Sequence, residues 1–476
     1  MKIGILTDYA RVALLTGPVF MTQFFKRELE KRGHGAQLIG PEDPDLQPGE
    51  VPPDTVLCPS FEFPHYKGYQ VPVPLDPGMF SRPWDLDLIH GQTNSLFLHF
   101  GVWLREYHGV PLLATNTIHL PSYTQHVLSD DIMRAEWLRG PLDWRMGVVV
   151  KHFAEDLYNH TDGMIVLSRH LVSYWRDLGV TAPIHVIPRP VRPEVFDRPV
   201  THDPYPEGFR RGHRILTVCR HAREKSVERV LQCFAAYVEP LVPDATLTLV
   251  GDGPAHAMLQ EMAGRLGVAD KVFFAGTVPQ DQLPEFYRNA DVFAYASLSE
   301  TFGCVVSEAL WSGLPAVAFD DAMGVAHQVR DGINGSLVPT QGFADPMADI
   351  VFGRALVKLL IDPLLRRRQG ARAARLARSE CAPERIMKMT LEAYDAAIEH
   401  RRRTLPEPAA DRGLAARALC TWRHVHSWGY QNSSFWMMGQ FFRSKSERVP
   451  DVLGQAVKLP SPAPMNSLPA RVRTAG

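Results

Sequence analysis

The sequence has few cysteines and no long hydrophobic run. The six cysteines among 476 residues lie far apart, without a Cys-x-x-Cys pair or the Cys/His spacing of a zinc site. This usage is typical of a reducing compartment and excludes a disulfide framework and a structural zinc site. No segment approaches the roughly 18 consecutive apolar residues that a membrane-spanning helix needs.

An excess of charge of either sign is also missing. The 51 Lys and Arg residues against 52 Asp and Glu leave a formal net charge of -1, which argues against a nucleic-acid-binding protein. With 45% hydrophobic residues, the chain is not globally disordered. The start, MKIGILTDYA, runs directly into a strand-like segment, so we expect no signal peptide. These features predict a cytoplasmic protein, with peripheral contact at the inner face of the membrane left open.

Two series of short apolar runs alternate with amphipathic stretches, which predicts an α/β protein with parallel sheets. The first series begins with a strand over Lys2–Thr7 and a helix over about 19–32, and it ends with the run IHVIP at 184–188. The second begins at Ile215. Between about 188 and 212, proline and charge dominate without a period, which predicts a linker between two domains.

The segment around Glu300 and Glu308 carries the strongest chemical signal. Glu300 follows a predicted strand, and Glu308 lies about one turn into the next predicted helix. Both then point towards the carboxyl edge of the sheet, where open α/β sheets bind ligands. Gly303 allows close backbone approach, and the amides near Cys304 form a helix N-terminus suited to phosphate. A bare pair of glutamates is more often an acidic first turn that complements the helix dipole.

The surrounding residues resemble a known family. SETFGCVVSEALWSGLPAVAF, residues 299–319, is similar to the donor-site signature of the retaining GT-B glycosyltransferases of family 4, the E-x7-E enzymes. VCRHAREK, residues 218–225, resembles the Arg…Lys segment with which that family holds the donor diphosphate. Residues 247–255, 272–278 and 331–339 match further segments in order. The resemblance extends from Lys2 to about 403 and is more specific in the second half.

The resemblance implies a GT-B fold, in which two Rossmann-like doubly wound domains face each other across a cleft. We expect an N-terminal acceptor domain over 1–200 and a C-terminal nucleotide-sugar donor domain over 201–385. A C-terminal helix over 386–410 returns towards the N-terminal domain. We expect an aromatic-rich segment and a disordered tail over 411–476, because the regular pattern degrades from about 404.

The resemblance also assigns roles to the charged residues. Glu300 contacts the hydroxyls of the transferred sugar, and Glu308 contacts the hydroxyls of the nucleotide ribose. Arg220 and Lys225 hold the diphosphate, whose growing negative charge must be met by fixed cations and amide dipoles when no metal is present. Taken alone, Arg220 and Lys225 are equally compatible with a solvated surface, since the run RHAREK is charged throughout.

Further donor contacts are implied for the backbone. Phe302, Gly303 and Cys304 offer amides to sugar and phosphate. Gly17 lets the first loop of the N-terminal domain approach the diphosphate, although an ordinary turn glycine would look the same in the sequence.

A histidine near the anomeric centre is also expected. The family usually places it in a strand end of the form PVVATxH, whereas PLLATNTIHLPSY puts His119 three residues beyond Asn116. We expect His119 to be the catalytic histidine, with Thr117 or His126 as alternatives for that position. His90 is expected to be a packing residue at a strand end.

These assignments predict a retaining, metal-independent hexosyltransferase. It would move a glucose- or mannose-type hexose from UDP- or GDP-hexose, its co-substrate, to a hydroxyl of a lipid or a growing glycan, without a cofactor. Front-face attack with the departing phosphate as base is the expected mechanism. The alternatives are a nucleotide-sugar epimerase of the same fold and a non-catalytic nucleotide-sugar-binding protein. The pair Asp85 and Asp87 suggests a metal-dependent transferase, but so short a pattern arises easily by chance.

The acceptor is less defined by the sequence, and the oligomeric state is not indicated. Basic and bulky apolar residues alternate between 133 and 151 in the half that would hold the acceptor. The tail adds aromatic residues beside Arg443 and Lys445, which suits either a membrane interface or the back of the N-terminal domain. These aromatics are Trp422, Trp428, Tyr430, Phe435, Trp436, Phe441 and Phe442.

One hinge segment departs from the family. VIPRPVR, Val186–Arg192, stands where the family usually has VIPNGVD. Because the segment joins the two expected domains, the departure bears on the domain geometry rather than on the donor chemistry.

Overall fold

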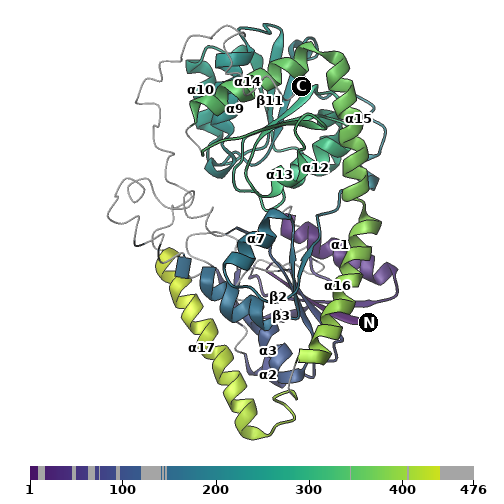
Figure 1. The fold of residues 1–476 in the computed structure, drawn as a ribbon, viewed down its shortest axis with the longest axis vertical. Helices are drawn as coiled ribbons and strands as arrows, with labels where there is room; N and C mark the ends of the chain where they lie inside the picture. Colours follow the sequence, from purple (N-terminus) through teal and green to yellow (C-terminus); the bar gives the residue numbers. More distant parts are fainter. Residues whose placement is uncertain are drawn as a thin grey trace.

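Two lobes make up the molecule, and each is built on its own parallel sheet (Figure 1). The structure is a computed structural model that describes residues 1–8, 17–44, 50–62, 70–73, 76–92, 97–119, 150–342, 345–404 and 407–439, together with 141, 144, 147 and 148. The predicted α/β class is confirmed. Continuous apolar runs form these strands because helices cover both faces of each sheet.

The sheet of the first lobe has the strand order β3-β2-β1-β6-β7-β8-β9, and all neighbours are parallel. Its strands are β1 (Lys2–Thr7), β2 (Gly35–Pro41), β3 (Val56–Cys58), β6 (Leu88–Gln92), β7 (Leu112–Thr115), β8 (Gly163–Val166) and β9 (Ile184–Val186). The helices of this lobe include α1 (Gly17–Lys31), α2 (Pro77–Ser81), α3 (Leu98–His108) and α7 (His170–Asp177). A short antiparallel pair, β4 (Ser60–Glu62) and β5 (Gln70–Pro72), was not predicted.

The sheet of the second lobe has the order β12-β11-β10-β13-β14-β15 and is also parallel. Its strands are β10 (His213–Val218), β11 (Ala245–Val250), β12 (Val272–Gly276), β13 (Val292–Tyr295), β14 (Ala316–Phe319) and β15 (Gly335–Val338). Its helices are α9 (Val227–Cys233), α10 (His256–Arg265), α11 (Leu283–Arg288), α12 (Cys304–Trp311), α13 (Gly324–Gln328), α14 (Pro346–Ile361) and α15 (Pro363–Glu380). The strand order reverses between β10 and β13, which makes their carboxyl ends the switch point of this sheet.

The proline-rich segment between the sheets is packed rather than loose. It contains the short helix α8 (Pro193–Phe196), and Val191, Phe196 and Tyr205 are buried in the core of the second lobe. The segment over 188–212 that was predicted as a linker lies between the two sheets and is packed against the second lobe. These three side chains and Val195 anchor a segment that carries no periodic pattern.

Two C-terminal helices lie along the first lobe (Figure 1). Helix α16 (Pro383–Thr404) leaves the second lobe and contributes Ile386, Met387 and Tyr394 to the core around β1. Helix α17 (Leu414–Gly439) follows, although the regular pattern was expected to degrade from 404. Its buried residues are spaced by four, and their period is obscured by exposed apolar residues on the opposite face.

A buried ion pair in the first lobe gives a stability prediction. Arg105 binds Asp162 with both nitrogens of its fork, at 2.8 and 2.9 Å, and the Asp162 side chain is fully buried. We expect Asp162→Ala to lower the free energy of unfolding by about 3–5 kcal/mol, because the Arg105 charge is left buried without compensation. Glu392→Ala, which removes the exposed partner of Lys388, should cost about 0–1 kcal/mol in the same denaturant titration. Equal losses in the two variants would contradict this account.

Candidate functional site

The charged residues singled out in the sequence gather at the switch point of the second sheet. Arg220 and Lys225 follow β10, and Glu300 follows β13, the neighbouring strand. Helices α12 and α13 lie on the side of the second lobe that faces the first lobe (Figure 1). The carboxyl ends of adjacent parallel strands thus bring together residues that are 75 positions apart, such as Lys225 and Glu300.

Glu300 is held by three donors on one oxygen. Its Oε1 accepts hydrogen bonds from Tyr295 Oη at 2.8 Å and Ser297 Oγ at 2.9 Å, and it forms an ion pair with Lys225 Nζ. Burial alone would raise the pKa of Glu300, but Lys225, Tyr295 and Ser297 together lower that pKa below its ordinary value. The carboxylate is therefore ionised and fixed in orientation, which suits positioning and electrostatic work.

The loop that carries Glu300 is fixed by the start of α13. Gly324 N donates to the Glu300 carbonyl at 2.8 Å, and Gln328 Nε2 donates to the carbonyls of Phe302 and Gly303. A Cβ on Gly324 would lie 2.5 Å from the Phe302 backbone, so only glycine fits there. Gly303 has φ 80° and precedes Cys304, the first residue of α12. The first amides of a helix have no intrahelical acceptor, so this N-terminus can receive an anion.

Glu308 has a different environment from Glu300. It lies within α12, accepts from Gln280 Nε2 at 2.9 Å and from Tyr287 Oη at 3.1 Å, and is 6% exposed. Burial raises the pKa of Glu308 to about 7, although the two hydrogen bonds act in the opposite direction. Gln280 in turn accepts a hydrogen bond from Arg192 of the hinge segment.

Of the two predicted diphosphate-binding cations, Arg220 and Lys225, only Lys225 contacts one of the two glutamates. Lys225 closes a short 3-10 turn over Arg223–Lys225 and contacts Glu300. Arg220 is exposed, and among the described residues no ion pair or side-chain hydrogen bond involves it.

The loop after β7 reaches the same place from the first lobe. Thr301 Oγ1 donates to the Thr117 carbonyl at 2.8 Å, across the boundary between the lobes. His119, two residues further, packs its ring edge-on against Tyr174 with 4.7 Å between ring centroids. Burial lowers the pKa of His119 to about 4, so its imidazole is neutral near pH 7. The alternative His126 lies outside the described residues.

Two other sequence predictions can be placed. His90 lies within β6, fully buried, and its ring bonds Tyr394 Oη at 2.7 Å and Thr115 Oγ1 at 2.8 Å, in agreement with a packing role. Asp85 and Asp87 are both engaged by Lys2, through its side chain and its backbone N–H respectively. No cluster of metal-ligating side chains occurs within the described part of the chain.

Gly17 is the first residue of α1. The loop before it, over 9–16, lies outside the described residues, as do most of the basic and aromatic positions over 133–145 and all those beyond 439.

The residues that support the two glutamates were missed in the sequence. Tyr295 and Ser297 share one face of a strand end because they are two positions apart, and this is the only signal that the sequence held. Tyr287 and Gln280 come from separate segments before β13, and nothing in their spacing predicted contact with Glu308.

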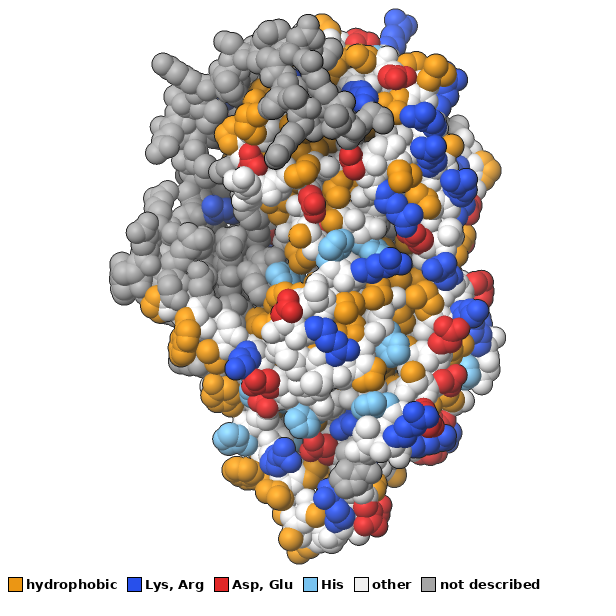
Figure 2. All heavy atoms as spheres, in the orientation of Figure 1, with side chains coloured by type: hydrophobic (Ala, Val, Ile, Leu, Met, Phe, Trp, Pro, Cys, Tyr) orange, Lys and Arg blue, Asp and Glu red, His pale blue; other side chains and the backbone are white. Residues whose placement is uncertain are grey.

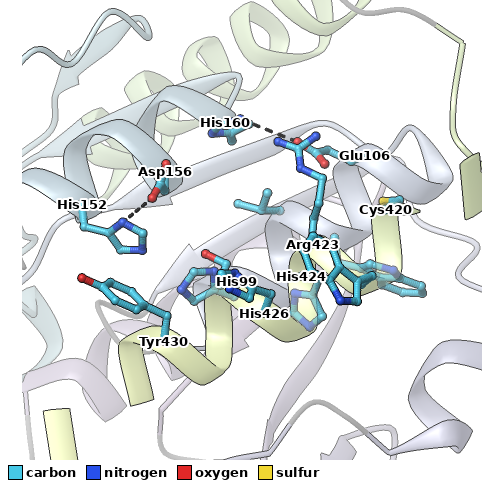
Figure 3. Close-up of a pocket in the computed structure, with 14 residues that line it drawn as sticks. His99, Glu106, His152, Asp156, His160, Cys420, Arg423, His424, His426 and Tyr430 are labelled. Carbon is cyan, nitrogen blue, oxygen red and sulfur yellow. Dashed lines mark ion pairs between the residues drawn. The ribbon is translucent and has the colours of Figure 1, made fainter. Parts of the chain in front are cut away.

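A cavity of about 520 Å³ lies elsewhere, between α3, residues 152–160 and α17 (Figure 3). Two ion pairs line it: His152 pairs with Asp156, and His160 pairs with Glu106 at 3.8 Å. None of the predicted donor-site residues lines this cavity. Its lining belongs to the first lobe and to the face that α17 turns towards it.

Comparisons with known proteins agree with this geometry. Residues 208–375 match the family described as Glycosyl transferases group 1, and residues 19–195 match the family Glycosyltransferase Family 4. Together the two matches extend over more than half of the chain. The chain has the fold and the enzyme class of a glycosyltransferase. It belongs to the GT-B glycosyltransferases of family 4.

Individual relatives are more distant. The chain is 26% identical over 335 residues to an alpha-monoglucosyldiacylglycerol synthase of Streptococcus pneumoniae, covering 67% of this chain and 71% of that protein. A D-inositol 3-phosphate glycosyltransferase of Streptomyces griseus is 41% identical over 146 residues, but only 29% of its length and 30% of this chain are matched.

Two solved structures share the fold. The sucrose-phosphate synthase from Thermosynechococcus elongatus matches with a TM-score of 0.63 at 20% identity, covering 83% of this chain and 98% of that one. HepE of Anabaena, in complex with UDP and glucose, matches with a TM-score of 0.59 at 17% identity, covering 83% of this chain and 100% of that one. These structures confirm the predicted GT-B fold, and the family matches confirm the predicted glycosyltransferase class.

The raised pKa of Glu308 gives a pH prediction. A carboxyl whose pKa rises from 4.5 to about 7 on folding stabilises the protein below about pH 4.5 and loses that contribution as the pH rises towards 7. As the pH rises between these limits, the free energy of unfolding of Glu308→Gln should increase relative to that of the wild type by up to about 3 kcal/mol. Denaturant titrations at each pH measure this difference. The exposed change Glu392→Gln should leave the wild-type pH profile in place. A profile for Glu308→Gln that runs parallel to the wild type would refute the buried-carboxyl assignment.

Proposed function

We propose that the protein transfers a hexosyl group from a nucleoside-diphosphate hexose to a hydroxyl of a lipid or glycan acceptor, with retention and without a metal. The observation that carries the proposal is the ionised Glu300, fixed by Lys225, Tyr295 and Ser297 beside the N-terminus of α12. In this proposal the donor binds to the C-terminal domain, residues 201–385, and the acceptor to the N-terminal domain, residues 1–200.

Each charged residue has a task in the reaction. Arg220 and Lys225 meet the charge that grows on the departing diphosphate, and the amides of Phe302, Gly303 and Cys304, just before and at the start of α12, add fixed dipoles. Glu300 orients the sugar hydroxyls and stabilises positive charge at the anomeric carbon. Attack comes from the face that the diphosphate leaves, and the leaving phosphate accepts the proton of the acceptor hydroxyl.

The remaining residues orient the donor. Glu308 accepts hydrogen bonds from the ribose hydroxyls, and Gly17 lets the first loop approach the diphosphate. His119, which is neutral near pH 7, lies on the loop that Thr301 joins to the donor site and can donate or accept a hydrogen bond at the sugar. HepE was solved with UDP and glucose, which favours a UDP-hexose of the glucose type as the donor.

Donor binding gives the first test of this function. The cognate sugar nucleotide, sought among UDP, GDP and ADP sugars, should add about 2.7 kcal/mol of stability at about 100 times its dissociation constant. Arg220→Gln and Lys225→Gln should each reduce transfer by about 10²–10³-fold, because a preorganised cation for the leaving group is lost. Thermal shift and turnover with the same donor measure both effects.

The control for these variants is Arg211→Gln, the same change at an exposed arginine of the loop before β10. Transfer that persists in excess EDTA supports the metal-free route. Formation of isomerised free donor alone would support an epimerase, and stabilisation by no sugar nucleotide would overturn the proposal.

Helix α17 suggests that the acceptor is met at a membrane surface. Its inner side packs on α3 through Cys420, His424 and Trp428. The helix also exposes Leu419 (57%) and Trp422 (61%), and Trp422 stands at the cavity between α17 and α3. Figure 2 shows hydrophobic side chains gathered along the edge that α17 forms. No helix within the described part of the chain is long and apolar enough to cross a bilayer.

The charge of α17 favours an anionic lipid surface. Its 26 residues include no Asp or Glu, and Arg417 and Arg423 are exposed beside the apolar side chains. A basic helix with exposed Trp and Leu is the pattern of an interfacial helix. The relative from Streptococcus pneumoniae is named for a glucosylated diacylglycerol, which agrees with a lipid acceptor and with peripheral attachment at the inner face of the membrane.

Vesicle flotation tests the membrane contact. The protein should float with phosphatidylcholine vesicles that contain phosphatidylglycerol and less with vesicles that lack it. The double change Leu419→Ser with Trp422→Ser should reduce the binding constant by about tenfold or more, since the apolar area available for burial is lost. The matched change Leu364→Ser, at an exposed leucine of α15, should have no effect. Equal flotation of the two variants would rule out α17 as the contact.

A further inference from the structure

The hinge segment places an arginine where the family usually has asparagine. In VIPRPVR, Arg189 follows β9 at the carboxyl edge of the first sheet, where it lines a small gap together with Gln92 and Thr115. Its positive charge lies near the thiol of Cys304, the first residue of α12 in the second lobe, and opposes the rise in the pKa of that thiol that burial causes. Arg189 thus lies between the two sheet edges, next to the loop of Glu300.

Arg189 is buried without a counter-ion. It is 7% exposed, and among the described residues no carboxylate or carbonyl oxygen is within bonding distance of its guanidinium. A charge taken out of water is costly unless it is paired and hydrogen-bonded. A neutral thiol is a weak acceptor and does not supply that compensation.

The other buried arginines that the structure describes are all satisfied. Arg105 is paired with Asp162, and Arg229 is paired with Asp349. Arg401 donates to the carbonyls of Gly109 and Arg105, at 3.0 and 3.2 Å. Each of these buried guanidinium groups is compensated by a carboxylate or by carbonyl oxygens, whereas no such partner of Arg189 occurs among the described residues.

We infer that Arg189 binds a phosphate group of a substrate, together with the amides at the start of α12. A planar guanidinium binds phosphate through two parallel hydrogen bonds, and a helix N-terminus presents further N–H groups to the same anion. The phosphate belongs either to the diphosphate of the donor or to a phosphorylated acceptor. The inference rests on the proposed function for the presence of a substrate at this place.

Calorimetry on the full chain separates the two sources. The probes are UDP, and inorganic phosphate added with and without saturating UDP. If Arg189 binds a phosphate of the donor, Arg189→Gln should weaken UDP binding by about 10- to 100-fold, the usual effect of losing a hydrogen bond to a charged group. The affinity of Arg189→Lys for UDP should be intermediate. If Arg189 binds a phosphate of the acceptor, Arg189→Gln should bind UDP as the wild type does. Inorganic phosphate should then bind to the UDP-saturated wild type but not to UDP-saturated Arg189→Gln. Arg211→Gln is the matched control and should bind both probes as the wild type does.

Thermal unfolding without ligand gives a second readout. Removing an uncompensated buried charge should leave the melting temperature of Arg189→Gln equal to or above that of the wild type, unlike Arg105→Gln, which breaks a satisfied pair. A sharp fall for Arg189→Gln would show that its charge serves the fold and would overturn the inference. So would unaltered binding of both UDP and phosphate by a folded Arg189→Gln.

The failure of the proposed function is distinguishable from these outcomes. A wild type that binds none of UDP, GDP and ADP, but binds phosphate in an Arg189-dependent way, would retain the anion site and refute the donor assignment. If instead the wild type and Arg189→Gln bind UDP equally and phosphate binding does not depend on Arg189, the anion site is refuted and the donor assignment is retained.

Discussion

The ion pair between Lys225 and Glu300 joins the ends of two neighbouring strands. Lys225 follows β10 and Glu300 follows β13, so the contact exists only because those strands lie side by side at the reversal of the strand order. Tyr295 and Ser297, at the end of β13, complete the coordination of the carboxylate. The position of the loop up to Cys304, and hence of the first amides of α12, depends on this arrangement and on the packing of Gly324 beneath it.

The two glutamates of the signature therefore differ in charge state, although the sequence presents them as a matched pair. Glu300 keeps its charge because a cation and two hydroxyls face one oxygen. Glu308 accepts hydrogen bonds from two neutral donors, Gln280 and Tyr287, and burial brings its pKa to about 7 although the charge of Arg192 acts in the opposite direction. An anionic residue suits contact with a sugar that develops positive charge, whereas a near-neutral carboxyl suits hydrogen bonding to hydroxyls. Environment, rather than residue type, separates the two tasks.

The fold was largely predictable because its strands are buried on both faces and read as continuous apolar runs, as in Lys2–Thr7. The parts that escaped prediction lack that pattern. The packed segment with Val191 and Phe196 looks like a linker, and α17 carries apolar residues on both its inner and outer sides. Within the site, the signature located Glu300, Glu308 and the α12 N-terminus. The supporting Tyr287 and Gln280 are brought there by tertiary packing, which local sequence does not record.

The backbone passes between the lobes at two places, once through the hinge segment and once where α15 gives way to α16. These two passages are bound to each other, since Val191 N donates to the Cys381 carbonyl at 3.0 Å. Both residues also belong to the core of the second lobe, so the two crossings leave that lobe from one place, and a change in the angle between the lobes would turn near it. Arg189, two residues from Val191, would then shift far less in such a movement than the outer rims of the lobes.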